Sequence, residues 1–109
     1  MAFDEGLAER VREHVRERPG LEEKRMFGGV GVMLNGNIAC GILSDDLIVR
    51  VGPGNDGPAL ARPAARAFDI TGRAMKGWVM VGPEVAEADA DLAAWVDQGI
   101  SFALTLPPK

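Results

Sequence analysis

The first clear pattern in the chain is an apolar residue at every fourth position near the N-terminus. Leu7, Val11 and Val15 form this series, and charged side chains fill most positions between them. A four-residue period predicts an amphipathic helix with one buried stripe. Asp4 is suited to cap it, because a carboxylate accepts the unpaired N–H groups of a first turn. Pro19-Gly20 is expected to end the helix, since proline cannot continue it and glycine permits the exit turn.

Three apolar segments follow, and they predict a meander of strands. We expect the strands at Lys24–Leu34, Asn37–Leu43 and Leu47–Val51. Asn35-Gly36 lies between the first two and is a strong hairpin signal, because a type I′ turn needs positive φ at both central residues. The polar run Ser44-Asp45-Asp46 predicts the second turn.

The second half of the chain alternates between turn-forming and apolar segments. Gly52–Pro58 contains three glycines and two prolines, which predicts a loop. We expect a short helix at Ala59–Arg62, followed by two more strands at Phe68–Thr71 and Lys76–Val81. The turn between these strands is expected at Gly72-Arg73.

The last apolar pattern has a helical period and predicts a helix from about Asp89 to Leu106. Its apolar face consists of Leu92, Trp95, Val96, Phe102, Ala103 and Leu106. Asp89 or Asp91 is expected to cap its start. Gly99 lies inside this helix and costs about 1 kcal/mol relative to alanine, so we expect a bend or close packing there.

The expected order is therefore a helix, three strands, a loop with a short helix, two strands and a helix. Hairpin connections make the sheet mainly antiparallel, and the N- and C-terminal helices each have one apolar stripe to bury. These features predict a two-layer α+β fold with both helices packed on one face. The length of 109 residues fits a single domain over residues 1–109.

Composition and charge narrow the class of protein. Hydrophobic residues make up 47% of the chain and charged residues 26%, as in ordinary globular domains. No apolar run approaches the roughly 18 residues that span a bilayer, and the acidic start does not resemble a secretory signal. Cys40 is the only cysteine, which fits a reducing compartment, so we expect a cytoplasmic protein without membrane contact. The net charge of −4 argues against tight, nonspecific nucleic-acid binding.

The glycines at positions 28, 29 and 31 invite comparison with a phosphate-binding loop. A dinucleotide fingerprint needs a third glycine where this chain has Leu34, and no Gly-Lys-Ser or Gly-Lys-Thr triplet exists. The segment also leads into further strand instead of a helix whose N-terminus could face a phosphate. We therefore interpret Met26–Gly31 as strand-forming scaffold.

Residues with catalytic or metal-binding chemistry are few. His14 is the only histidine, and one histidine with one distant cysteine does not make a metal site. Cys40 lies in an apolar strand, where a free cysteine usually acts as a small hydrophobic residue. We expect no catalytic residue, no metal and no cofactor, and therefore a protein that is not an enzyme.

Cations between residues 51 and 83 offer a contact surface for a partner. Residues 51–83 carry a net charge of +2, whereas residues 84–109 carry −4. The possible contact residues are Arg62, Arg66, Arg73, Lys76 and Trp78. Arg73 and Lys76 could bind an acidic partner, and Trp78 could add an aromatic anchor. We favour the alternative of a solvated hairpin with the tryptophan in the core, because aromatic residues of strands are mostly buried.

Several blocks resemble the N-terminal domain of the TfoX/Sxy family, named for regulators of bacterial competence. The matching residues are Lys24–Gly31, Asn35-Gly36, Asp45–Val51, Phe68–Arg73 and Met75–Val79. The resemblance runs from the first helix to Leu106. It implies a two-layer α+β fold and a link to transcriptional regulation, in which longer members act as coactivators beside a DNA-binding regulator. It implies no catalytic residue and no cofactor. Longer members carry a second domain, so we expect a stand-alone, single-domain member.

Our leading hypothesis is a non-enzymatic protein-interaction domain whose partner is a protein such as a transcription regulator. Two alternatives stay open: direct nucleic-acid binding through the Arg62–Lys76 region, and a small-molecule or enzymatic role near Cys40 and the Gly52–Pro58 loop. An open sheet face or edge could also pair two copies of the chain into a homodimer.

Overall fold

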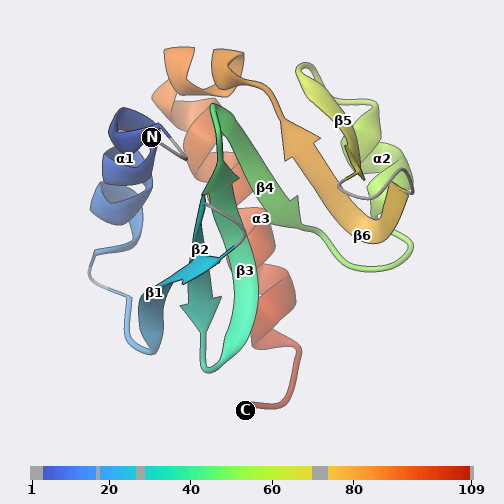
Figure 1. Ribbon diagram of the computed structural model, residues 1–109. Helices are drawn as coiled ribbons and strands as arrows, with labels where there is room; N and C mark the ends of the chain where they lie inside the picture. The colour runs from blue at the N-terminus through green and yellow to red at the C-terminus, as the bar shows by residue number, and fades with distance from the viewer. Residues whose placement is uncertain (1–3, 17, 27–28, 70–73, 109) are drawn as a thin grey trace.

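The computed structural model describes residues 4–16, 18–26, 29–69 and 74–108 of the chain. In chain order its elements are α1 (Glu5–Val15), β1 (Leu21–Met26), β2 (Gly29–Leu34), β3 (Asn37–Leu43), β4 (Asp46–Arg50), α2 (Asp56–Leu60), β5 (Ala65–Asp69), β6 (Ala74–Val81), the 3₁₀ helix η1 (Pro83–Glu87) and α3 (Asp89–Leu104). Figure 1 shows them along the chain. The predicted α+β class is confirmed, with one strand more than expected.

The strands form one sheet in the order β1-β2-β3-β4-β6-β5, and every neighbouring pair is antiparallel. The first four strands are a meander. The chain then leaves the sheet through α2, returns as β5 at the edge, and places β6 between β5 and β4. The edge strands are therefore β1 and β5.

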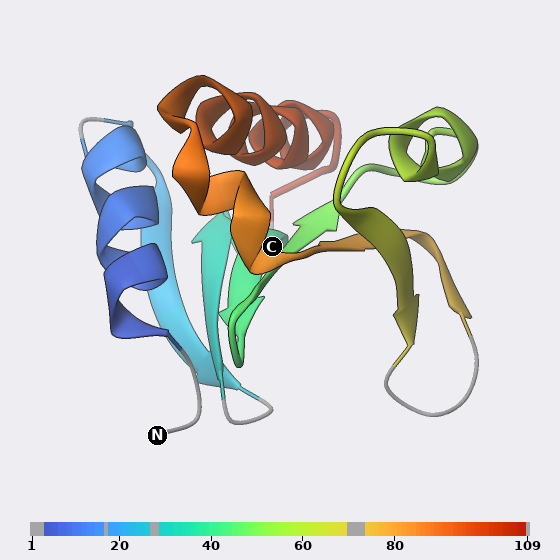
Figure 2. The ribbon, with the colours of Figure 1, turned by 90° about the horizontal axis from the view of Figure 1, so that it is seen from above.

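The helices cover one side of this sheet, as predicted, and Figure 2 shows α1, α3 and α2 along that side. The helix α3 crosses β3 and β4 at close range. A Cβ atom added to Gly99 would lie 2.3 Å from the carbonyl oxygen of Ala39 and 3.4 Å from Val49 Cγ1. The glycine in the last helix thus marks close packing, one of the two outcomes expected from the sequence.

The core lies between the helices and this side of the sheet. Its largest fully buried side chains are Val11, Cys40, Ile42, Leu47, Val49, Val51, Val79, Val81, Val96 and Ile100. They come from α1, α3, three central strands and the residue that follows β4, so the core joins both ends of the chain.

The prediction of one strand at Lys24–Leu34 is wrong. β1 and β2 are an antiparallel pair in which Met26 lies opposite Gly29, so the chain reverses direction between these residues. Phe27-Gly28 lies outside the described residues. The charges of Leu21–Met26 hid the extra strand, because a solvated edge strand lacks the apolar run that indicates a buried one. The interpretation of Met26–Gly31 as scaffold holds for Gly29–Gly31, which belong to β2.

The hairpin predicted at Asn35-Gly36 is confirmed. Asn35 has φ of 52° and Gly36 has φ of 84°, as a type I′ turn requires. β3 has the predicted bounds, and β4 begins one residue earlier than predicted, at Asp46. The next turn uses Ser44 with φ of 56°.

The short helix and the last two strands begin earlier in the chain than predicted. The helix α2 starts inside the expected loop, β5 starts at Ala65 instead of Phe68, and β6 starts at Ala74 instead of Lys76. The turn predicted at Gly72-Arg73 falls outside the described residues. These differences concern segments rich in alanine, whose preference for helix or strand is decided by tertiary packing.

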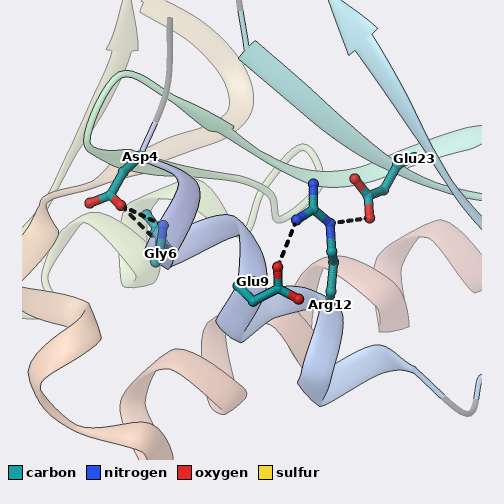
Figure 3. A network of polar contacts seen from close by, with 6 residues as sticks. Asp4, Gly6, Glu9, Arg12 and Glu23 are labelled. Carbon is teal, nitrogen blue, oxygen red and sulfur yellow. Dashed lines mark hydrogen bonds and ion pairs between the residues drawn. The ribbon is translucent and has the colours of Figure 1, made fainter. Parts of the chain in front are cut away.

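Local polar contacts fix the start of α1 and hold it against β1 (Figure 3). Asp4 Oδ1 accepts the backbone N–H groups of Gly6 (2.9 Å) and Leu7 (3.1 Å), which confirms the predicted cap. Arg12 lies between Glu9 on its own helix (3.2 Å) and Glu23 on β1 (2.5 Å). The helix ends at Val15, before the proline-glycine pair that was expected to end it.

The start of α3 differs from the prediction. Ala88 occupies the N-cap position, and no side chain caps the helix, so the expected cap by Asp89 or Asp91 is wrong. Asp89 instead forms an ion pair with Arg10 of α1. This pair joins the two long helices at one end of their contact.

A second polar contact joins the same two helices further along. Asp97 Oδ1 of α3 lies 2.8 Å from His14 Nε2 and 3.2 Å from Arg18 Nη2. His14 therefore contributes to the contact between α1 and α3.

Replacing Gly99 by alanine should destabilise the domain by about 1–3 kcal/mol, because the new methyl group overlaps a backbone carbonyl that cannot move aside. This loss outweighs the gain of about 1 kcal/mol in helix propensity. Chemical denaturation would measure it. Gly57→Ala is the matched control, because nothing lies within 4 Å of its Cβ position. A Gly99→Ala domain as stable as wild type would contradict the close packing.

Candidate functional site

The side of the sheet opposite the helices also carries apolar residues. Val49 touches α3, so its neighbour Ile48 points to the opposite side. In the antiparallel ladder Ile48 lies opposite Met80 and opposite Gly41, and paired residues share a face. Ile48 is only 5% exposed, yet it lies outside the core that the helices cover.

The same surface continues across β2 and β3. Met33 lies opposite Ile38, and Gly31 lies opposite Gly41, so two glycines replace side chains in its centre. We call the surface formed by Met33, Ile38, Ile48, Trp78 and Met80 the bare face. No helix that the structure describes packs on it (Figure 2). Four of its five members are half-buried, and Ile48 is buried.

At one end of the bare face an arginine lies among aromatic rings. Arg50, the last residue of β4, pairs with Trp78 of β6 in the ladder. Its guanidinium carbon lies 5.5 Å from the centroid of the Trp78 ring and 5.4 Å from that of Phe102. The rings of Phe68 and Trp78 are 5.8 Å apart at 46°. Contacts of this kind between a cation and ring faces are attractive.

The structure separates the residues that the sequence offered as partner contacts. Arg66 forms an ion pair with Asp46 at 2.8 Å, and Lys76 is exposed. Trp78 is half-buried and lies outside the core, so the expectation that it is a core residue is wrong. Its strand turns an alternate side chain to each face, and only one face is covered by helices. Arg73 lies outside the described residues.

Arg62, the remaining candidate, lies on the helix side. Its guanidinium stacks on Trp95 of α3, 3.4 Å from the ring centroid, and donates to Gln98 Oε1 at 2.6 Å. Burial lowers the pKa of Arg62, with a smaller opposite effect from Asp91. A hollow of about 350 Å³ beside it is bordered by Glu84 and other residues of η1 and α3. The contacts of Arg62 hold the segment after α2 against α3, away from the bare face.

Arg50 was not predicted as a contact residue, although the alternation of side chains along its strand indicates its position. Leu47 and Val49 are core residues, whereas Ile48 and Arg50 are not. The alternation along β4 therefore already placed the arginine on the same face as Ile48. The apolar content of Leu47–Val51 predicts a strand, and only its period of two assigns Arg50 to a face.

The surroundings of Cys40 argue against a nucleophile. Its side chain is fully buried, opposite Val32 on one side and Val49 on the other. Burial raises the pKa of the thiol to about 12, so the reactive thiolate is scarce at neutral pH. Three hollows on the described surface are lined by other residues.

The described part of the chain offers neither a metal-binding cluster nor a membrane-spanning helix. No group of three or more histidine, cysteine, aspartate or glutamate residues there could hold a metal ion. None of the described helices is long and apolar enough to cross a membrane.

Comparison with known proteins gives one match. The model of the family described as the TfoX N-terminal domain matches residues 13–103, which is most of the chain. No curated protein and no solved structure matches it. The matched range begins inside α1 and ends inside α3, so it includes the whole sheet and the bare face.

Native Cys40 should not react with Ellman's reagent at pH 8, because it is buried and about one thiol in 10⁴ is ionised at that pH. The same protein in denaturant should release one equivalent of the coloured product within minutes. Absorbance measures both. Rapid labelling of the native domain, with the far-UV circular dichroism unchanged, would show that the thiol is accessible.

Proposed function

The chain belongs to the TfoX N-terminal domain family, and we propose that it is a non-enzymatic protein-interaction domain that binds its partner through the bare face. The family supports a regulatory role, and we propose a transcription regulator as the partner. The proposal places the domain in the cytoplasm, where a single free thiol is stable.

One observation carries this proposal. The sheet has two apolar faces, and the described helices cover only one of them (Figure 2). An apolar surface on a soluble domain that is bordered by polar residues is typical of a protein-binding site. Methionine, tryptophan and arginine, which are enriched in such interfaces, are all present on or beside it.

Charged residues border the bare face on both sides. On β1, Glu22 and Lys24 lie opposite Met33 and Gly31. On the far side Arg66 pairs with Asp46. An apolar centre with a polar rim is the usual arrangement of an interface that forms and dissociates.

Nucleic-acid binding has weaker support. It needs several free cations on one surface, because its affinity comes from phosphate neutralisation. Arg62 is stacked on the helix side and Arg66 is paired with a carboxylate. The net charge of −4 adds repulsion.

Met80→Glu should weaken partner binding by about tenfold or more, because a charge would be buried at the centre of the interface. The measurement is affinity capture on immobilised domain, followed by quantitative mass spectrometry of the captured proteins. Leu104→Glu is the matched control, since Leu104 is 59% exposed and lies on α3, away from the bare face.

Both variants should keep the thermal unfolding midpoint of wild type within a few degrees. A partner that the Leu104→Glu domain loses and the Met80→Glu domain keeps would contradict the proposal. Light scattering on both variants identifies the case in which the partner is a second copy of the chain: only Met80→Glu would then shift the mass to that of a monomer.

A further inference from the structure

Arg50 is a positioned cation whose N–H groups have no hydrogen-bond acceptor among the residues that the structure describes. Trp78 and Phe102 contact its guanidinium from two elements, and Phe102 is itself packed against Gly52, where a Cβ atom would lie 2.5 Å from its ring. Phe68 supports Trp78 in turn. The guanidinium is therefore held at one place at the end of the bare face.

Other arginines of this fold donate to acceptors within the protein. Arg12 donates to Glu9 and Glu23, Arg62 donates to Gln98, and Arg66 donates to Asp46. Within the described ranges of the chain, Arg50 has ring contacts and neither a hydrogen bond nor an ion pair. Its N–H groups form a planar fork that matches the two oxygens of a carboxylate.

The surrounding charges favour an anion at this place. Several acids of the adjoining elements are engaged elsewhere. Asp46 of β4 accepts from Arg66, and Asp56 of α2 accepts the backbone N–H of Gly77 at 3.4 Å. Asp97 of α3 pairs with His14 and Arg18. Lys76, which is exposed, lies two residues before Trp78 on the same strand. Burial removes part of the hydration of a cation and so raises its free energy. A bound carboxylate lowers that free energy, because its oxygens replace the lost water.

We propose that Arg50 binds an aspartate or glutamate side chain of the partner protein, within a partner segment that also places apolar side chains on Ile48 and Met80. This inference rests on the proposed function and specifies the chemistry of the partner. The carboxylate forms two parallel N–H···O bonds with the guanidinium. Ile48 and Arg50 are two residues apart on β4, and the guanidinium lies at the end of this strand between Trp78 of β6 and Phe102 of α3. A single extended segment that runs along β4 therefore reaches both the apolar residues and the arginine.

A polyanion would present phosphate oxygens to the same donors. The net charge of −4 disfavours binding of a polyanion, because its many phosphates are repelled by the negative potential of the whole domain. A protein segment with one acidic residue and several apolar residues brings a single carboxylate to Arg50. Its apolar side chains can then cover Ile48 and Met80. The observations therefore favour a protein carboxylate over a nucleic-acid phosphate.

The test is an NMR titration of ¹⁵N-labelled wild-type domain, followed at Arg50 Nε–H and at the Trp78 indole N–H. The first probe is a ten-residue peptide of leucine, serine and glutamate with blocked ends, and the second has glutamine at each glutamate. Inorganic phosphate and a 12-base-pair DNA duplex are the other two probes. We expect the glutamate peptide to shift both signals and to bind about tenfold or more tightly than the glutamine peptide.

The variants separate charge from geometry. Arg50→Gln should weaken binding of the glutamate peptide about tenfold or more, and Arg50→Lys by about threefold or more, because lysine keeps the charge and loses the fork. Arg18→Gln is the matched control: it removes an arginine that is paired with Asp97 on the helix side, and binding should stay within about twofold.

Several results would overturn the inference: equal binding of both peptides, no binding of either peptide at millimolar concentration, tighter binding of the DNA or phosphate, or unchanged binding by Arg50→Gln. The peptide pair on wild-type protein decides the question even if that variant does not fold.

If Met80→Glu abolishes partner capture and Arg50→Gln does not, the proposed function stands and the carboxylate site fails. If Met80→Glu leaves capture intact, the proposed function fails first.

Discussion

The contact of α3 with the middle of the sheet is the constraint on which the rest of the structure depends. Gly99 lets this helix approach the backbone of β3 so closely that a methyl group would overlap the carbonyl of Ala39. The approach brings Val96 and Ile100 into one core with the central strands. Polar contacts of Arg10 and His14 then hold α1 beside α3 on the same side. These contacts commit α1 and α3 to one face of the sheet, and α2 lies on the same side (Figure 2).

This commitment leaves the opposite face uncovered by the described helices. Strand geometry sends alternate side chains to the two faces, so a strand apolar on both sides needs a covering on both sides. β4 has such a pattern: Val49 meets α3, Ile48 belongs to the bare face, and Arg50 ends the series beside Trp78. The surface proposed for binding and the cation proposed to recognise a carboxylate are consequences of the same one-sided packing.

Much of the fold was predictable because local signals are strong where backbone geometry is demanding. Asn35-Gly36 specified a turn that needs positive φ, and Asp4 specified a helix start. The predictions failed where the decisive contact is distant. The charged strand β1 is held by pairing with β2, and Asp89 pairs with Arg10 instead of capping its own helix. Of the residues predicted as possible partner contacts, Trp78 lies on the bare face and Arg62 lies on the helix side.

The sequence by itself determined the α+β class, the β2–β3 hairpin and the family, because periodicity, turn chemistry and short motifs depend on neighbouring residues. Only the tertiary structure decided which face of the sheet stays bare, that the segment Met26–Gly31 spans the point where the chain reverses, and that Arg50 lies between two aromatic rings. Those rings come from β6 and α3, and Arg50 comes from β4. Their meeting depends on strand order and helix position, which no local pattern encodes.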